Sequence, residues 1–237
     1  MNLENRVAVI TGATGGLGRV VARRLAAEGA RLALVSSDSG RLEALGRELS
    51  LPEGRWLARA ADLTSPAGAQ AAAKAVLAKF GRVDILLHLV GGWTGGKTVS
   101  QVPVEQMASM LQQHLWTTFY VAQAFVPHLV ANGWGRIMAV SSPAATRPAV
   151  KGAPYAAGKA AQEALLLTLA QELTGSGVTA NLLVVRAIDV QHRRDSERTA
   201  ETVAWTTPEE IASAIVYLCS DAAGVVNGAH IPLYGAP

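Results

Sequence analysis

The sequence predicts an α/β protein with one doubly wound parallel sheet of seven strands and helices on both faces. Short, β-branched apolar runs alternate along the chain with longer Ala- and Leu-rich segments of helical period, which is typical of strands that pair in parallel. Some strands are apolar at consecutive positions, as in Ile85-Leu86-Leu87, and a sheet covered on both faces requires this. At 237 residues, we expect a single domain over residues 1–237.

The alternation places each element in order. Strands are expected at residues 7–11, 31–36, 56–60, 85–90, 136–141, 178–184 and 229–233. Helices are expected at residues 16–28, 40–49, 66–80, 104–130, 155–174 and 208–220. One segment departs from this pattern, because residues 188–207 are polar and charged. It is predicted as a solvated loop or, since it follows a strand at the ligand-binding edge of the sheet, as a lid over a substrate.

Composition narrows the classes of function. Half of the residues are apolar and 16% are charged, and the mean hydropathy is +0.23. Apolar surface beyond what one domain buries favours a homo-oligomer. The net charge is +3, and Lys and Arg are scattered along the chain. Nucleic-acid binding would need a basic stripe, so we expect a small-molecule substrate and no nucleic acid.

Cysteine usage and the apolar stretches favour a cytoplasmic protein. The single cysteine, Cys219, excludes an intramolecular disulfide and fits a reducing compartment as a buried structural thiol. The first strand begins at residue 7, which leaves no room for a signal peptide. Polar residues interrupt the most apolar long stretch, at 160–173, and it is too short to cross a membrane.

A glycine-rich turn follows the first strand, in the segment Thr11-Gly12-Ala13-Thr14-Gly15-Gly16-Leu17-Gly18. The glycines allow a tight turn and close backbone approach, and the helix that follows offers free N–H groups and a positive dipole end to a pyrophosphate. A merely flexible turn is the alternative, but the position between first strand and first helix favours a Rossmann-type dinucleotide site. The expected contacts are Gly12, Thr14, Gly15, Gly16, Leu17 and Gly18.

The residues after the second strand bear on the choice between NADP and NAD. A carboxylate there would bind the adenosine ribose of NAD, whereas donors or a basic residue would accept the 2′-phosphate of NADP. The sequence has Ser36, Ser37 and Asp38, with Arg41 shortly after. Because serine hydroxyls donate to a phosphate without repelling it, we expect NADP, with NAD as the alternative if Asp38 reaches the ribose.

Other strand ends supply further expected cofactor contacts. Asp62 and Leu63 follow the third strand, where Asp62 either meets the adenine or caps the helix that begins near Ser65. The remaining expected contacts lie after the fourth and sixth strands, at Val90, Gly91 and Ile188.

A tyrosine and a lysine, Tyr155 and Lys159, lie four residues apart at the start of a helical pattern. This spacing puts both side chains on one face of a helix. A phenol with an ordinary pKa near 10 becomes an acid or base near neutral pH when a nearby cation favours the phenolate. The pair therefore predicts a proton-transfer site.

With Ser142 ending the fifth strand thirteen residues before Tyr155, these motifs together resemble the short-chain dehydrogenase/reductase family from about residue 5 to the C-terminus. The resemblance implies that Tyr155 protonates a carbonyl oxygen as hydride arrives from the nicotinamide. It also implies that Lys159 lowers the pKa of Tyr155 and holds the nicotinamide ribose, and that Ser142 hydrogen-bonds the substrate oxygen.

The chain departs from the family pattern at three places. His88-Leu89-Val90-Gly91 stands where members carry Asn-Asn-Ala-Gly, Val185-Arg186 replaces Pro-Gly, and His114 takes the position of an asparagine that completes the usual catalytic set. His114 is either a proton relay through a water or a hydrogen-bonded core histidine. The histidines have no ligand-like spacing, so no metal is expected.

The resemblance thus implies an NAD(P)-dependent ketone or 3-oxoacyl reductase, or alcohol dehydrogenase. It also implies a homotetramer or homodimer paired through the helices from residues 104 and 155. The segments Val90-Gly91-Gly92-Trp93, Leu115-Trp116-Thr117-Thr118 and Trp205-Thr206-Thr207-Pro208 look like the dihydropteridine reductase-like side of the family, which is the alternative activity. A dinucleotide-binding sensor without turnover is the alternative of another class.

Overall fold

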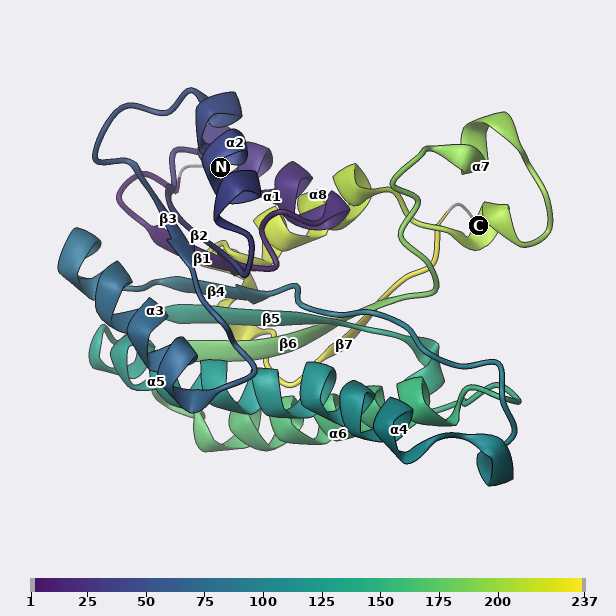
Figure 1. Ribbon diagram of the computed structural model, residues 1–237. Coiled ribbons are helices and arrows are strands. Elements are labelled where there is room, and N and C mark those ends of the chain that lie inside the picture. The colour runs from purple at the N-terminus through teal and green to yellow at the C-terminus, as the bar shows by residue number, and fades with distance from the viewer. Residues whose placement is uncertain (1–2, 236–237) are drawn as a thin grey trace.

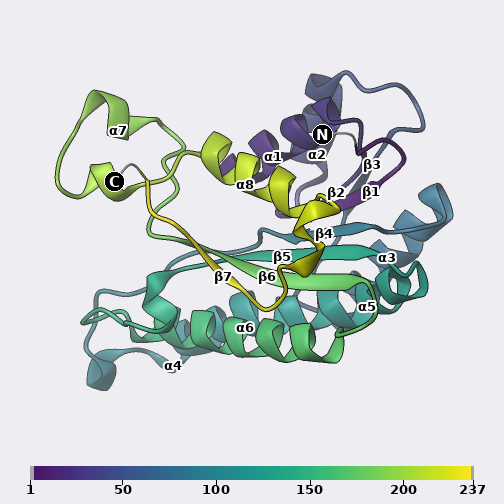
Figure 2. The ribbon, with the colours of Figure 1, turned by 180° about the vertical axis from the view of Figure 1, so that it is seen from behind.

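Seven parallel strands form one sheet in the computed structural model, which describes residues 3–235. Their order across the sheet is β3-β2-β1-β4-β5-β6-β7, and Figures 1 and 2 show the sheet from opposite sides. The strands are β1 (Val7–Thr11), β2 (Arg31–Ser36), β3 (Trp56–Ala60), β4 (Ile85–His88), β5 (Gly135–Ser141), β6 (Val178–Val185) and β7 (His230–Leu233). The order reverses between β1 and β4, where open α/β sheets bind their ligands.

Helices cover both faces of this sheet, which confirms the predicted fold class (Figure 1). One face carries α1 (Gly16–Ala27), α2 (Ser39–Leu49) and α8 (Pro208–Leu218). The other carries α3 (Pro66–Phe80), α4 (Val104–Leu111), α5 (Thr117–Ala131) and α6 (Ala153–Glu172). None of the helices in residues 3–235 has the length and apolar character needed to cross a membrane.

Two apolar clusters, one on each face, hold the layers together. Alternate residues of a strand point to opposite faces, so Ile10 packs with α1 and α8 residues such as Ile215, whereas Val9 packs with Phe125 and Leu166 beneath the sheet. All five side chains are almost completely buried. Burying a side chain of this size contributes about 1.5–3 kcal/mol.

The predicted helix 104–130 is interrupted by a π-helical turn at Gln112–Trp116. The hydroxyls of Thr117 and Thr118 donate to the carbonyl oxygens of Gln113 and His114, four residues earlier. Such side-chain bonds compete with the backbone N–H groups of an α-helix and bend it. The turn contains His114, and π-turns occur often at functional sites.

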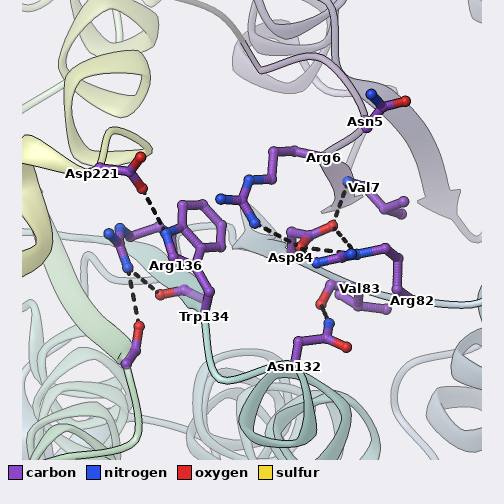
Figure 3. Close-up of polar contacts among 12 residues, drawn as sticks. Asn5, Arg6, Val7, Arg82, Val83, Asp84, Asn132, Trp134, Arg136 and Asp221 are labelled. Carbon is purple, nitrogen blue, oxygen red and sulfur yellow. Dashed lines mark hydrogen bonds and ion pairs between the residues drawn. The ribbon is translucent and has the colours of Figure 1, made fainter.

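A buried carboxylate ties the amino ends of the strands together (Figure 3). Asp84 is fully buried and accepts from the backbone N–H of Val7 at 2.9 Å and from the guanidinium groups of Arg6 at 3.2 Å and Arg82 at 3.0 Å. The Arg6 guanidinium also lies over the Trp134 ring, 3.6 Å from its centroid. This network fastens β1 to β4 at the edge opposite the strand ends discussed below.

The segment 188–207 contains the short helix α7 (Arg193–Ser196) and projects away from the sheet (Figure 1). Ile188 pairs with Thr206 in a β-bridge at its base. The buried Asp189 carboxylate accepts from the backbone N–H groups of Arg193 and Arg194, each at 2.8 Å. Arg194 also pairs with Glu210 of α8 at 2.8 Å. The segment is thus attached to α8; its role as a lid stays a prediction.

Candidate active site

Three neighbouring cavities lie at the carboxyl edge of the sheet. The glycine-turn cavity, of about 270 Å³, is lined by residues that include Gly12, Ser36 and Asp62. The tyrosine cavity, of about 330 Å³, is lined by Tyr155, Lys159 and their neighbours. The two share Leu89, Val90 and Gly91 and so form one groove. The arginine cleft, of about 610 Å³, shares Trp93 and Tyr155 with the tyrosine cavity.

The structure brings the predicted site residues to these cavities, except Gly16 and Gly18, which line none of the three. Those that line the glycine-turn cavity are Gly12, Thr14, Gly15, Ser36, Ser37, Asp62, Leu63, Val90 and Gly91. Those that line the tyrosine cavity are Leu17, Val90, Gly91, His114, Tyr155, Lys159 and Ile188. Ser142 lines the arginine cleft instead, beside Tyr155.

Three glycines of the turn lie too close to neighbouring atoms for a side chain to fit. Gly12 has φ +70°, and a Cβ there would lie 2.9 Å from the carbonyl of Leu89. A Cβ at Gly18 would lie 2.4 Å from the Gly12 oxygen, and one at Gly16 would lie 2.7 Å from Val190. The N-cap of α1, Gly15, has no side-chain capping bond, so the first N–H groups of α1 are open to a pyrophosphate.

After β2, where a carboxylate would bind the ribose of NAD, serine residues line the glycine-turn cavity. The hydroxyls of Thr14 and Ser36 lie 2.8 Å apart. Asp38 is the N-cap of α2, where it accepts from the Arg41 N–H at 3.0 Å and pairs with the Arg41 guanidinium at 3.3 Å. Asp38 does not line the cavity, whereas Ser36 and Ser37 do.

The alternative that Asp62 caps the following helix is wrong. Ser65 caps α3, accepting from the Gly68 N–H at 3.1 Å. Asp62 instead accepts from the hydroxyl of Thr64 at 2.6 Å and from its N–H at 2.9 Å. These bonds lower the pKa of Asp62, which leaves a carboxylate at the cavity wall.

Tyr155 lies in the first turn of α6 between the tyrosine cavity and the arginine cleft. Burial raises the pKa of its phenol above 10, and a hydrogen bond with Ser142 opposes the rise. The expected lowering by Lys159 is not found here, because the Lys159 ammonium is directed elsewhere. Its Nζ lies 5.9 Å from the Tyr155 ring centroid and donates to Val140 O at 2.8 Å and to Gln162 Oε1 at 3.0 Å.

Lys159 is almost fully buried, with 4% of its surface exposed. Burial lowers its pKa from 10.5 to about 7, with the charge of Glu163 acting in the opposite direction. Glu163 in turn accepts from the Ser141 hydroxyl at 2.6 Å and lies 2.9 Å from a ring nitrogen of His230. The charged ammonium and the neutral amine are therefore both present near pH 7.

His114 lies in the π-turn with its ring edge against Tyr155, at a centroid distance of 5.5 Å. It is fully buried, and burial together with the Lys159 charge lowers its pKa to about 4. Its Nε2 donates to the carbonyl of Gly92 at 3.0 Å, so the neutral ring carries its lone pair on Nδ1. Nδ1 has no hydrogen-bond partner in residues 3–235. His114 is thus hydrogen-bonded through one nitrogen and unpaired at the other.

A buried hydrogen-bond chain that the sequence did not indicate links Lys159 to His114. Lys159 Nζ donates to Gln162 Oε1, and Gln162 Nε2 donates to the Thr118 hydroxyl at 3.0 Å. That hydroxyl donates to the His114 carbonyl. The only signal in the sequence was a polar residue, Gln162, inside an apolar helical stretch.

His88, which lies in another of the three departures from the family pattern, is structural. Its two ring nitrogens lie 2.8 Å from the Thr11 hydroxyl and 3.2 Å from the Thr117 hydroxyl. Burial lowers its pKa to about 3, so the ring is neutral and ties β4 to β1 and α5. Within residues 3–235, no three His, Cys, Asp or Glu side chains are grouped so that they could hold a metal ion.

Comparison with known proteins places this geometry in a family. The short chain dehydrogenase family model matches residues 6–202. D-threitol dehydrogenase of Mycolicibacterium smegmatis is 34% identical over 98% of this chain and 93% of its own length. A 3-oxoacyl-[acyl-carrier-protein] reductase of Vibrio cholerae is 31% identical over 99% of this chain and 98% of its own.

Solved structures of similar proteins support the same family assignment. The chain superposes on 3-ketoacyl-(acyl-carrier-protein) reductase from Brucella melitensis, complexed with NADH, with a TM-score of 0.87 and 28% identity over 98% of each chain. It superposes on L-sorbose reductase from Gluconobacter frateurii, complexed with NADPH and L-sorbose, with a TM-score of 0.88 and 26% identity, covering 99% of this chain and 97% of that one. The chain therefore belongs to the short-chain dehydrogenase family and is an NAD(P)-dependent oxidoreductase.

Proposed function

We propose that this enzyme reduces a ketone or aldehyde with NADPH, with Tyr155 as the proton donor. The observation that carries the proposal is the position of Tyr155 between the groove and the arginine cleft. A cofactor bound in the groove would supply hydride to the carbonyl carbon. The Tyr155 hydroxyl would give its proton to the carbonyl oxygen, which the Ser142 hydroxyl holds. Because burial raises the pKa of Tyr155, the phenol is protonated at neutral pH, as the reductive direction requires.

The groove fits a dinucleotide through its bare backbone turn, where a Cβ at Gly12 or Gly18 would collide. In this proposal Gly12, Thr14, Gly15, Gly16, Leu17 and Gly18 hold the pyrophosphate region. Asp62 and Leu63 contact the adenine, and Val90, Gly91, Ile188 and Lys159 surround the nicotinamide ribose. NADP is favoured over NAD because the hydroxyls of Ser36 and Ser37 line the cavity whereas Asp38 is engaged as a helix cap.

His114 is proposed to help return a proton to Tyr155 through a water. His114 Nδ1 and Lys159 Nζ each lie 3.9 Å from the point where a Cβ of Gly91 would stand, so both border the same small volume. A water there could donate to the unpaired Nδ1 and accept from the ammonium, which satisfies the buried acceptor. The neutral ring suits such a relay, since it accepts a hydrogen bond without first losing a proton.

The substitution Tyr155→Phe tests the proposed donor. Purified protein is assayed with NADPH and NADH against ketones, 3-oxoacyl thioesters and quinonoid pterins. The variant should lose at least about 100-fold in kcat, the size typical of general acid catalysis, while its affinity for NADPH, read by fluorescence titration, stays within a few-fold. Turnover that survives in the variant would contradict the role of Tyr155. Cofactor binding without turnover of any carbonyl would favour the non-catalytic sensor instead.

The alternative activities lack comparable support. The relatives named above lend none to a dihydropteridine reductase or a sensor, and a tyrosine placed beside Ser142 at the cleft has no use in a pure binder. The substrates in their names range from D-threitol to a 3-oxoacyl group on acyl-carrier protein. The substrate must therefore be inferred from the cleft of this chain.

A homo-oligomer, either a tetramer or a dimer, and a cytoplasmic location complete the proposal. Trp116, Phe119 and Tyr120 form an aromatic cluster next to a groove between α5 and α6. Trp116 and Phe119 are 43% and 38% exposed, which favours pairing of these helices with a second copy. Light scattering across a concentration series measures the assembly. The cytoplasmic location rests on the single cysteine, Cys219, which is buried.

A further inference from the structure

We propose that the carbonyl substrate carries a carboxylate and that Arg186 binds it in the arginine cleft. This inference rests on the proposed function and names the substrate class that the same site would take. The cleft contains Ser142 and Tyr155, which would receive the carbonyl oxygen, and it contains the cations Arg186 and Lys151 but no acidic side chain. An anion at the cleft would thus meet attraction and no repulsion from the wall.

The Arg186 guanidinium is placed so that it can bind an anion. Arg186 follows β6, where the family resemblance led us to expect glycine. Its Cζ lies 4.8 Å from the centroid of the Tyr234 ring, so the ring stabilises the guanidinium by a cation–π contact. The N–H groups of its guanidinium form no hydrogen bond within residues 3–235, and such donors match a carboxylate in a bidentate pair.

Arg186 also has no carboxylate partner among the described residues, in contrast to two arginines of the neighbouring segment. Arg193 and Arg194 of the neighbouring segment pair with Glu197 and Glu210. Arg186 forms no such pair within residues 3–235, and its side chain is exposed at the cleft. A charged donor group without an internal partner, placed beside the proposed proton donor, indicates a partner in the substrate.

The remaining wall of the cleft limits the rest of the substrate. The carbonyl of Lys151, a residue with φ +62°, accepts from the Gly96 N–H at 2.8 Å, which attaches the loop containing Trp93 to the far wall. The Trp93 indole is 67% exposed and borders both cleft and tyrosine cavity. The body of an oxo acid would lie along this ring, with its carbonyl at Tyr155 and its carboxylate at Arg186.

The test compares acids with neutral isosteres. The enzyme is assayed with NADPH on 2-, 3-, 4- and 5-oxo acids and on their primary amides, so that chain length locates the spacing between carbonyl and carboxylate. At least one acid should exceed its amide by about tenfold or more in kcat/KM, the effect of a charge-assisted hydrogen bond. Arg186→Gln should reduce that ratio toward one, and Arg186→Lys should restore part of it. The matched control is Arg147→Gln, an exposed arginine outside the cleft lining, which should keep the full ratio.

Binding measured without turnover separates this inference from the proposed reaction. Calorimetry on the NADP-loaded protein compares the preferred oxo acid with its amide, in the wild type and in Arg186→Gln. Tighter binding of the acid that depends on Arg186, without turnover, supports the carboxylate site and contradicts the proposed reductase. Equal binding or turnover of acids and amides overturns the carboxylate site. A preference for the acid that survives Arg186→Gln but disappears in Lys151→Gln overturns it as well. The proposed ketone reduction would then stand without the carboxylate site.

Discussion

Replacing Lys159 with methionine should remove a specific pH dependence from the stability of the unliganded protein. Burial lowers the pKa of Lys159 from 10.5 to about 7. Between these two pH values the unfolded chain binds more protons than the native protein, so the free energy of unfolding rises with pH. Below about pH 7 the lysine is charged in both states and this contribution is constant.

The magnitude follows from the two pKa values. A full proton difference changes the free energy of unfolding by about 1.4 kcal/mol per pH unit. Because the native lysine is still half protonated at pH 7, the rise from pH 7 to pH 9 is about 2 kcal/mol. Lys159→Met also leaves Val140 O and Gln162 Oε1 without their donor, at a cost of roughly 1–3 kcal/mol for each group at every pH. The slope with pH, not stability at one pH, therefore carries the information.

The assay is urea unfolding at pH 7, 8 and 9 and one protein concentration, for the wild type, Lys159→Met and Lys74→Met. Lys74 is an exposed lysine of α3 and serves as the matched control. We expect the difference between Lys159→Met and wild type to shift by about 2 kcal/mol across this range in favour of the wild type, and the control to show no such shift. A Lys159→Met variant with the full wild-type slope would refute the lowered pKa.

Two further substitutions test the sheet and the groove. Asp84→Ala removes the buried partner of two arginines and leaves the Val7 N–H unpaired, and should lower the urea-derived stability by about 3 kcal/mol. Glu48→Ala, which breaks a more exposed pair of arginine contacts, should cost below about 1 kcal/mol; equal losses would contradict the importance of burial. Gly12→Ala and Gly81→Ala both place a side chain at positive φ, but only at Gly12 would the Cβ meet backbone, 2.9 Å away. Gly81→Ala should lose about 1 kcal/mol of stability and Gly12→Ala more than that. Only Gly12→Ala should weaken NADPH binding in a fluorescence titration, by tenfold or more; similar affinities would argue against the turn as the pyrophosphate site.

Local sequence patterns predicted the sheet, most of the helices and the motifs at the strand ends. Strand and helix periods depend on neighbours two to four residues away, so the predicted strand at residues 7–11 and helix at residues 66–80 agree with β1 and α3. The glycine turn is equally local, since its position between a strand and a helix already indicated the groove. The spacing of Tyr155 and Lys159 placed both residues in the tyrosine cavity for the same reason.

Tertiary structure alone decided the chemistry around those motifs. The pKa of Tyr155 is raised because the phenol is buried, while the Lys159 ammonium donates to Val140 O. Both features depend on contacts outside the helix. The π-turn around His114 arises where α6 packs closely, since a Cβ at Gly158 would lie 2.8 Å from the Met110 carbonyl. The position of the Arg186 guanidinium depends on its contact with Tyr234, a residue 48 positions away in the sequence. Partners so distant along the chain leave no periodic signal, and only folding brings them together.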